Sequence, residues 1–351
     1  MNNSKLWSIL CVGLALVLLL TLGGFTAVVD PFFHYHAPLD SLEYPLNSQR
    51  YQNDGIVRHF EYDALITGTS MTENYKTSEF DALFGVHSIK VSYSGGTYAE
   101  MYSNLQQAIR SNPELKTVIF CIDEWFLFSG RNMILADGAY PTYLYDDSLV
   151  NDVEYLLNKE VLCSNTLEVL SYTAEGNLTT SFDDYSSWVF PYDRDVVLGN
   201  YQRPEISKPE VFTEEQAANL TDNLTTTAVQ MARENPEIRF YYYFPPYSIL
   251  NWDSHQRMGT LEREVAAFRL ASQILLEEPN IRLFSFYTDY ETITNLDNYR
   301  DTVHHSDVIN SLLLQRFHSG EYRLTKETTE QHWDTVLEYY TNYDYEALFL
   351  P

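Results

Sequence analysis

The feature that most constrains this chain is an uncharged apolar run of 24 residues, Leu6 to Val29, interrupted only by three hydroxyl side chains and three glycines. About 20 apolar residues in a helix, at 1.5 Å per residue, cross the hydrocarbon core of a membrane. A cleavable signal peptide usually has a shorter apolar region of about 7–15 residues. The run therefore predicts a transmembrane anchor over residues 1–29. A long signal peptide, cut near Thr26–Ala27, is the alternative that shares this outline.

The charges around the run predict its orientation. Lys5 precedes it, whereas Asp30, Asp40 and Glu43 follow it and no Lys or Arg occurs before Arg50. Positive residues near a membrane helix remain on the cytoplasmic side. We therefore expect a single-pass protein of the cell membrane whose C-terminal part is extracytoplasmic. No second run of about 18 apolar residues occurs in the sequence.

Composition excludes some classes of partner. The formal net charge is −27, from 49 acidic and 22 basic residues. Nucleic acid demands a basic face, and anionic lipid attracts basic segments, so neither nucleic acid nor a lipid surface is an expected ligand of the exported part. Most of the 28 Tyr, 19 Phe and 5 Trp are expected to serve ordinary packing, whereas an excess of exposed Tyr and Trp would suit a surface on which sugar rings stack. His34 and His36 lack further metal ligands, so the sequence predicts no metal site. The serine chemistry considered below requires no organic cofactor either.

After a polar connector over residues 30–60, strand-like and helix-like segments alternate. Short apolar segments at 62–67, 88–92, 117–122, 239–244 and 281–286 read as buried strands, and amphipathic segments separate them. This alternation predicts an α/β domain over residues 61–351, with a parallel sheet and crossover helices. Residues from about 125 to 210, rich in Tyr, Asp and Ser, break the alternation and are expected to form an insertion.

The carboxyl ends of parallel strands form the ligand-binding edge of such a sheet. The first strand ends at Gly68-Thr69-Ser70, and Asp301-x-x-His304 follows the fifth. Acyl transfer through serine needs an exposed hydroxyl, a histidine base, an acid that orients the histidine, and N–H donors for the oxyanion. Ser70, His304 and Asp301 can supply the first three. Gly95 or Gly96, after the second strand, can supply a close backbone N–H.

These motifs, in this order, resemble those of the SGNH/GDSL hydrolase superfamily. The chain is similar to its membrane-anchored bacterial members, related to the D-alanine transfer protein of teichoic-acid operons and to alginate-type O-acetyltransfer proteins. The resemblance covers about residues 60–320. It implies a three-layer flavodoxin-like fold, with Ser70 as nucleophile, His304 as base and Asp301 as the residue that orients it.

One position departs from the resemblance. The superfamily has Gly-x-Asn after the third strand, where the Asn donates to the oxyanion, and this chain has Cys121-Ile122-Asp123. An ionised Asp only accepts hydrogen bonds. Asp123 is therefore protonated, or orients another donor, or the donor lies elsewhere, for instance at Asn74.

The resemblance implies a serine acyl esterase or O-acyltransferase that acts on a cell-envelope polysaccharide or its acyl ester. A multi-pass membrane acyltransferase is a candidate partner. The alternative is a non-catalytic SGNH-fold module that binds or assembles an envelope-modification complex, and Asp123 is the feature that favours it.

Overall fold

The computed structural model describes residues 3–133 and 140–350. Its first element is helix α1, Asn3–Val29, which is apolar and largely unburied. Ser4–Val29 is long and apolar enough to cross a membrane, a test that a signal sequence also passes. The predicted N-terminal apolar helix is therefore confirmed, and the choice between anchor and signal stays open.

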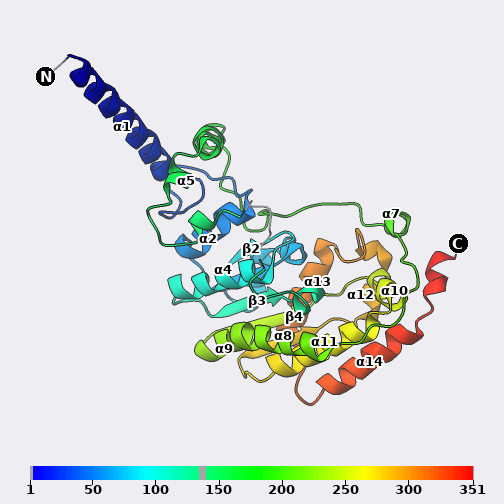
Figure 1. Cartoon of the computed structure of the whole chain (residues 1–351). Coiled ribbons are helices and arrows are strands. Elements are labelled where there is room, and N and C mark those ends of the chain that lie inside the picture. The colour runs from blue at the N-terminus through cyan, green and yellow to red at the C-terminus, as the bar shows by residue number, and fades with distance from the viewer. Residues whose placement is uncertain (1–2, 134–139, 351) are drawn as a thin grey trace. The chain divides into compact units, whose positions relative to one another are not determined.

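The centre of the fold is one five-stranded parallel sheet with strand order β2-β1-β3-β4-β5 (Figure 1). The predicted α/β class and the five parallel strands are confirmed. All five strands lie within one or two residues of the predicted segments: β1 Ala64–Gly68, β2 Ser88–Ser92, β3 Thr117–Cys121, β4 Arg239–Phe244 and β5 Ile281–Ser285.

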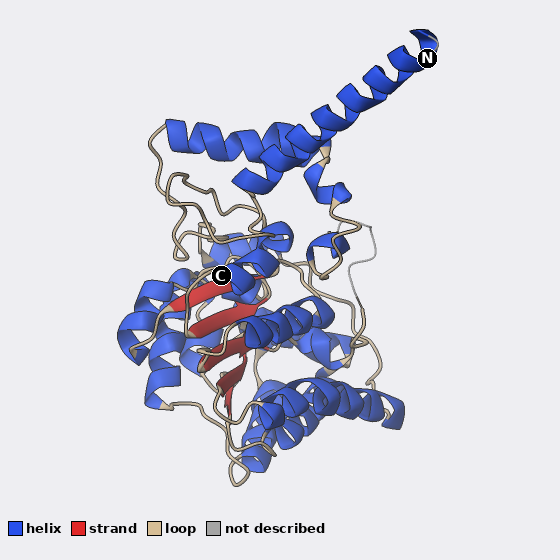
Figure 2. Ribbon diagram, turned by 90° about the vertical axis from the view of Figure 1, so that its left-hand side faces the viewer, coloured by secondary structure: helices blue, strands red, loops and turns tan. Residues whose placement is uncertain are grey.

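Helices cover both faces of this sheet (Figure 2). Tyr241 of β4 contacts Phe84 and Phe317 on one face, whereas Phe244 contacts Phe268 and Trp333 on the other. The first face carries α3 Thr77–Phe84 and α13 Asp307–Ser319. The second carries α4 Tyr98–Ser111, α8 Glu214–Leu224, α9 Gln230–Glu234, α11 Leu261–Leu275 and α14 Thr329–Asn342.

Among the described residues, three shorter helices complete this part of the chain. The sequence pattern did not indicate α7 Arg194–Asn200, α10 Ile249–Met258 or α12 Tyr290–Thr294. The helix expected from Thr213 begins there, because the Thr213 side chain and Gln216 form a capping box. Between α8 and α9 the same helix contains a π-helical segment, Thr225–Val229.

Contacts divide the chain into two compact units, Met1–Glu61 with Ala136–Ser181, and Tyr62–Leu135 with Phe182–Pro351. The first unit holds α1, α2 Gln49–His59, α5 Val153–Leu156 and α6 Thr166–Ala174. In this unit, α2 lies so close to the backbone of Phe32 that a Cβ on Gly55 would be 2.2 Å from the Phe32 carbonyl oxygen. The second unit holds the whole sheet. The expected boundaries near residues 29, 60, 125 and 210 stay predictions.

Candidate functional site

The end of β1 presents a serine on a tight turn. A Cβ on Gly68 would lie 2.6 Å from Thr72 Cγ2 and 2.8 Å from Cys121 Cβ, so only glycine fits where β1 ends against β3. A 3-10 turn, Ser70–Thr72, follows at once. The Thr69 hydroxyl accepts from the Met71 N–H at the start of this turn. Gly68 thus lets the chain turn sharply, and Ser70 is half-buried at the carboxyl edge of the sheet.

A hydrogen-bonded chain links Ser70 to His304 and Asp301. Ser70 Oγ lies 2.8 Å from His304 Nε2, and His304 Nδ1 lies 2.7 Å from Asp301 Oδ2. The other oxygen, Asp301 Oδ1, accepts from the backbone N–H groups of Val303 and His304. With Nδ1–H donating to the carboxylate, Nε2 is the nitrogen that can accept the serine proton. The structure thus brings Ser70 to Asp301 and His304, which lie more than 230 residues later in the sequence.

Asp301 is held in its charged form. Burial by itself would raise the pKa of Asp301, but the hydrogen bonds and charge of His304, with two backbone N–H donors, outweigh burial and lower that pKa below its ordinary value. A carboxylate that stays ionised keeps the His304 ring in one tautomer and orientation.

Asp123 lies at the end of β3 and accepts two hydrogen bonds. The Thr69 hydroxyl donates to Asp123 Oδ2 at 2.6 Å, and the Tyr247 hydroxyl donates to Asp123 Oδ1. Burial raises the pKa of Asp123, against the lowering effect of both donors. Asp123 therefore fixes the residue that precedes Ser70. Tyr247 lies in the turn Pro245-Pro246-Tyr247 after β4, and its hydrogen bond to Asp123, 124 residues earlier, leaves no local pattern in the sequence.

Asn74 has a fixed orientation and an unused donor. Its Oδ1 accepts the backbone N–H of Trp188 at 2.9 Å. Its Nδ2 is buried and has no hydrogen-bond partner among the described residues. Glu73, its neighbour, accepts from the Trp188 indole N–H at 2.7 Å. Two hydrogen bonds from Trp188 therefore hold the segment that follows Ser70.

The two glycines after β2 differ from each other. The Gly96 N–H donates to the Tyr93 carbonyl at 2.7 Å, within the turn, and a Cβ on Gly96 would lie 2.4 Å from Tyr93 Cβ. Gly95 is exposed with φ +56°, a left-handed conformation that favours glycine. This turn continues directly from the strand that pairs with β1, since Ser92 is in register with Gly68. The Gly96 N–H is already used by the turn.

An aromatic ring packs against His304, and a second ring and a guanidinium lie next to it. The Trp188 ring meets the His304 ring edge to face, with centroids 5.8 Å apart. The Arg300 guanidinium lies 3.7 Å from the Phe190 ring centroid and 5.2 Å from that of Trp188. The sequence indicated an aromatic-rich stretch here but gave no means to select Trp188 or Phe190, because a contact across more than 100 residues leaves no local pattern.

His305 lies outside the hydrogen-bonded chain. It is buried, its Nδ1 lies 3.3 Å from the Ser306 carbonyl oxygen, and burial lowers its pKa to about 4. In the part of the chain that the structure describes, no group of three or more His, Cys, Asp or Glu side chains could hold a metal ion.

Comparisons with known proteins give little further information. No protein-family model matches the chain, and no curated protein matches its sequence. Among solved structures, it is similar to a Streptococcus pneumonia protein described as a candidate platelet activating factor, with 13% identity and a TM-score of 0.38, over 78% of this chain and 90% of that one. A similarity this low assigns neither a fold family nor an activity to this chain.

Proposed function

We propose that this protein is a serine acyl esterase or O-acyltransferase of the SGNH type. The observation that carries the proposal is the hydrogen-bonded chain from Ser70 through His304 to Asp301, with heavy-atom distances of 2.8 and 2.7 Å. These distances lie within the reach that proton transfer between a nucleophile and its base requires. The strand order 2-1-3-4-5, which is also that of flavodoxin-like sheets, is consistent with the SGNH fold.

The reaction follows from these positions. His304 Nε2 takes the Ser70 proton as Oγ attacks the ester carbonyl, and Asp301 stabilises the imidazolium that forms. The tetrahedral oxyanion collapses, the ester C–O bond breaks, and the leaving alcohol takes the proton from His304. Water or a sugar hydroxyl then attacks the acyl-serine and gives its proton to His304. The bond between the acyl carbon and Ser70 Oγ breaks, and His304 returns the proton to Ser70.

The oxyanion donor in this proposal is the amide of Asn74. Its Nδ2 is buried and without a partner among the described residues, and its rotamer is fixed through Oδ1 by Trp188. Transition-state stabilisation needs a hydrogen-bond donor whose orientation is fixed before the oxyanion forms. The role of Asp123 is to hold Thr69 and thereby position Ser70, and not to donate.

The proposed setting is the outer surface of a cell membrane, with α1 as anchor and a cell-envelope glycopolymer or its acyl ester as substrate. Trp188 beside His304, with Phe190 beside Trp188, suits the apolar face of a sugar ring. An anchor keeps the serine near a membrane-bound acyl donor at high effective concentration, which favours transfer over hydrolysis and a multi-pass acyltransferase as partner.

A fluorophosphonate probe tests the nucleophile. The full-length chain in detergent should be labelled, and peptide mass spectrometry should place the label on Ser70. Ser70→Ala should abolish the label, whereas Ser171→Ala, at a serine on α6 outside this site, should leave it unchanged.

The alternative, a non-catalytic binding or assembly module, is favoured by the two hydrogen bonds that Asp123 accepts, because Asp123 supplies no N–H donor where the superfamily has Asn. A folded wild-type chain that takes no label and cleaves no activated acyl ester would establish this alternative. If ester cleavage occurs, adding envelope polysaccharide should divert the acyl group from water to polymer. Acid release that dominates at saturating polymer would instead indicate an esterase.

A further inference from the structure

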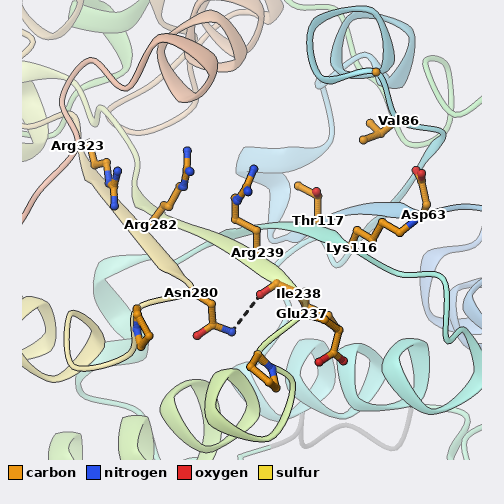
Figure 3. A pocket seen from close by; sticks show the side chains of 13 residues that line it. Asp63, Val86, Lys116, Thr117, Glu237, Ile238, Arg239, Asn280, Arg282 and Arg323 are labelled. Carbon is orange, nitrogen blue, oxygen red and sulfur yellow. Dashed lines mark hydrogen bonds between the residues drawn. The ribbon is translucent and has the colours of Figure 1, made fainter.

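A cavity of about 750 Å³ lies at the other edge of the sheet, where the strands begin (Figure 3). Arg239 is the first residue of β4 and Arg282 the second of β5, and Thr117, which also lines the cavity, is the first of β3. Ser70 follows the carboxyl end of β1. At about 3.3 Å per residue, a five-residue strand separates the two edges by roughly 16 Å. This cavity is therefore separate from the serine site.

The register of the sheet gathers arginines on one face. Arg282 is paired with Tyr241, which is two residues from Arg239, so these side chains share a face. Arg323 forms an antiparallel bridge with Phe284, which is two residues from Arg282. The three arginines thus form a diagonal row across β4, β5 and the adjoining segment. Diagonal neighbours lie about 7–8 Å apart, within reach of long side chains.

In Figure 3 the side chains of Arg239 and Arg282 extend in the same direction, while Glu237 extends the opposite way. Lys116 also lines the cavity, and its acidic lining residues are Asp63 and Glu237. The lining therefore carries four basic and two acidic side chains. Burial, with the nearby charges of Arg282 and Arg239, lowers the pKa of Arg323, which agrees with cations that repel one another.

These arginines lack the carboxylate partners that other arginines of this chain have. Arg203 pairs with Asp253, Arg269 with Glu330, and Arg316 with Asp289. Within residues 3–133 and 140–350, no ion pair joins Arg239, Arg282 or Arg323 to an acid; Arg282 makes a 3.5 Å contact to the Tyr241 hydroxyl. In a chain with 49 acidic and 22 basic residues, three adjacent arginines without a carboxylate are a cluster that an anionic ligand would neutralise.

We propose that Arg239, Arg282 and Arg323 form a binding site for an anion that carries two linked phosphate groups. The guanidinium fork matches the geometry of phosphate oxygens. Neighbouring arginines of the row can hold one phosphate between them, and the full row can hold two. Such a group occurs as a free diphosphate, and also as the diphosphate headgroup of a lipid at a membrane surface.

Calorimetry on the full-length chain in non-ionic detergent tests the site with pyrophosphate, inorganic phosphate and carboxylate-only malonate as probes. Pyrophosphate should bind at low salt, about tenfold or more tighter than phosphate, and added salt should weaken it. Arg239→Gln and Arg282→Gln should each weaken binding by roughly ten- to hundredfold. Arg282→Lys, which keeps the charge and loses the fork, should be intermediate. Arg233→Gln, at an arginine paired with Glu278, is the matched control and should change nothing.

A second arm separates the sources of the phosphate. Phosphatidylcholine vesicles that contain a prenyl diphosphate, compared with phosphatidylcholine alone, report headgroup binding. If these vesicles bind, free pyrophosphate does not, and the arginine variants lose the vesicles, the site takes a lipid diphosphate headgroup. If pyrophosphate binds and is lost in the variants, the ligand is a free anion.

Thermal unfolding distinguishes a ligand site from a structural cluster. Without ligand, Arg282→Gln should unfold at the same or a higher temperature, because repulsion between cations is relieved. Pyrophosphate should raise the midpoint of the wild type and not that of the variant. The proposal is overturned if neither pyrophosphate nor the vesicles bind, or if malonate binds as tightly as pyrophosphate. It is also overturned if the Arg239→Gln, Arg282→Gln double variant binds pyrophosphate and vesicles like the wild type.

Discussion

At the scale of single residues, the proposed site depends on which atom of each side chain is already occupied. Asn74 shows this most directly. Its oxygen is used by the Trp188 N–H, and its nitrogen is buried without a partner among the described residues. Asp123, in contrast, has both oxygens occupied by hydroxyl donors. The donor that the SGNH resemblance places after the third strand is therefore proposed at a residue from another turn.

Asn74→Asp tests this assignment with little change in shape. The carboxylate still accepts from Trp188 but can no longer donate, and it repels negative charge. We expect kcat to fall by about 10²–10³, as for the loss of one oxyanion donor, with a small change in KM. Steady-state kinetics with an activated acyl ester measure the effect, and exposed Asn219→Asp is the control. An unchanged kcat would remove Asn74 from the mechanism.

Asp301→Asn tests the orienting acid. The amide keeps the size of the side chain, but it cannot hold the Nδ1–H tautomer of His304 that lets Nε2 accept from Ser70. We expect kcat to fall by about 10⁴, the loss known for this change in a serine triad, while the midpoint of thermal unfolding changes little. Steady-state kinetics and circular dichroism on the same preparation measure both. Near wild-type kcat in a folded Asp301→Asn protein would contradict the triad.

At the scale of elements, hydrogen bonds to Asp123 connect the segments that follow three neighbouring strands. It follows β3, Thr69 follows β1, and Tyr247 follows β4. The position of Ser70 thus depends on this junction as well as on its own turn.

Asp123→Asn should weaken the hydrogen bonds at this junction. The Asn amide has one acceptor oxygen and one N–H group, so one of the two hydroxyls, of Thr69 or Tyr247, can no longer donate to residue 123 and has to reorient. The loss of a buried partner costs about 1–3 kcal/mol, which corresponds to roughly ten- to hundredfold in kcat if it is expressed at Ser70. Kinetics and urea unfolding on the same preparation measure both effects, with exposed Asp222→Asn as control. Increased activity would mean that Asp123 faces the oxyanion as an unfavourable charge.

The elements could be predicted where the pattern is local. The five strands are short apolar segments bounded by turn residues, and their parallel direction followed from the alternation with helices. Ser70, Asp301 and His304 could be selected because strand ends share an edge. Trp188 and Tyr247 could not, since their partners depend on side-chain packing between distant segments. The arginine row needs the register of β5 with β4 and the bridge from Arg323, which no periodicity encodes.

At the scale of the whole molecule, buried histidines make stability depend on pH. Burial lowers the pKa of His305 and of His332 to about 4, against about 6.5 in an unfolded chain. Between these values the unfolded state binds protons that the folded state does not, so stability falls as pH falls from about 6.5 to 4. The contribution of fully buried His305 would reach roughly 3 kcal/mol at pH 4.

His305→Gln should therefore make the pH dependence shallower, by up to about 1.4 kcal/mol per pH unit across that range. Urea unfolding followed by tryptophan fluorescence, at several pH values, measures the slope, and four of the five tryptophans lie in the unit that contains the sheet. His332→Gln should act in the same direction. Equal slopes in wild type and His305→Gln would show that this histidine takes up its proton before unfolding.

The packing at the end of α1 bears on whether this helix remains attached to the mature protein. The residues around the alternative cleavage position are built into the first unit. Thr26, Val29 and Asp30 are buried, and the Asp30 carboxylate accepts from three backbone N–H groups, at residues 34–36, and from the Tyr155 hydroxyl. A Cβ on Gly23 would contact Leu156 and Leu157 at 3.6 Å, so the end of α1 also packs against α5.

A signal peptidase needs an extended, accessible segment, whereas here the helix continues to Val29 and ends in a packed unit. We therefore expect the mature protein to retain residues 1–29 and to resist extraction from membranes by alkaline carbonate. The intact mass of the purified protein measures retention.

A reporter fused after Pro351 measures orientation, and it should be active only outside the cytoplasm, because Lys5 precedes the helix and acids follow it.

Asp30→Asn is the matched test of the packing argument. It weakens the carboxylate's four hydrogen bonds and should make the N-terminal segment more sensitive to added protease. A mature chain that begins near Ala27 would instead make α1 a signal sequence and the proposed enzyme a released one, and would remove the effective-concentration argument for acyl transfer.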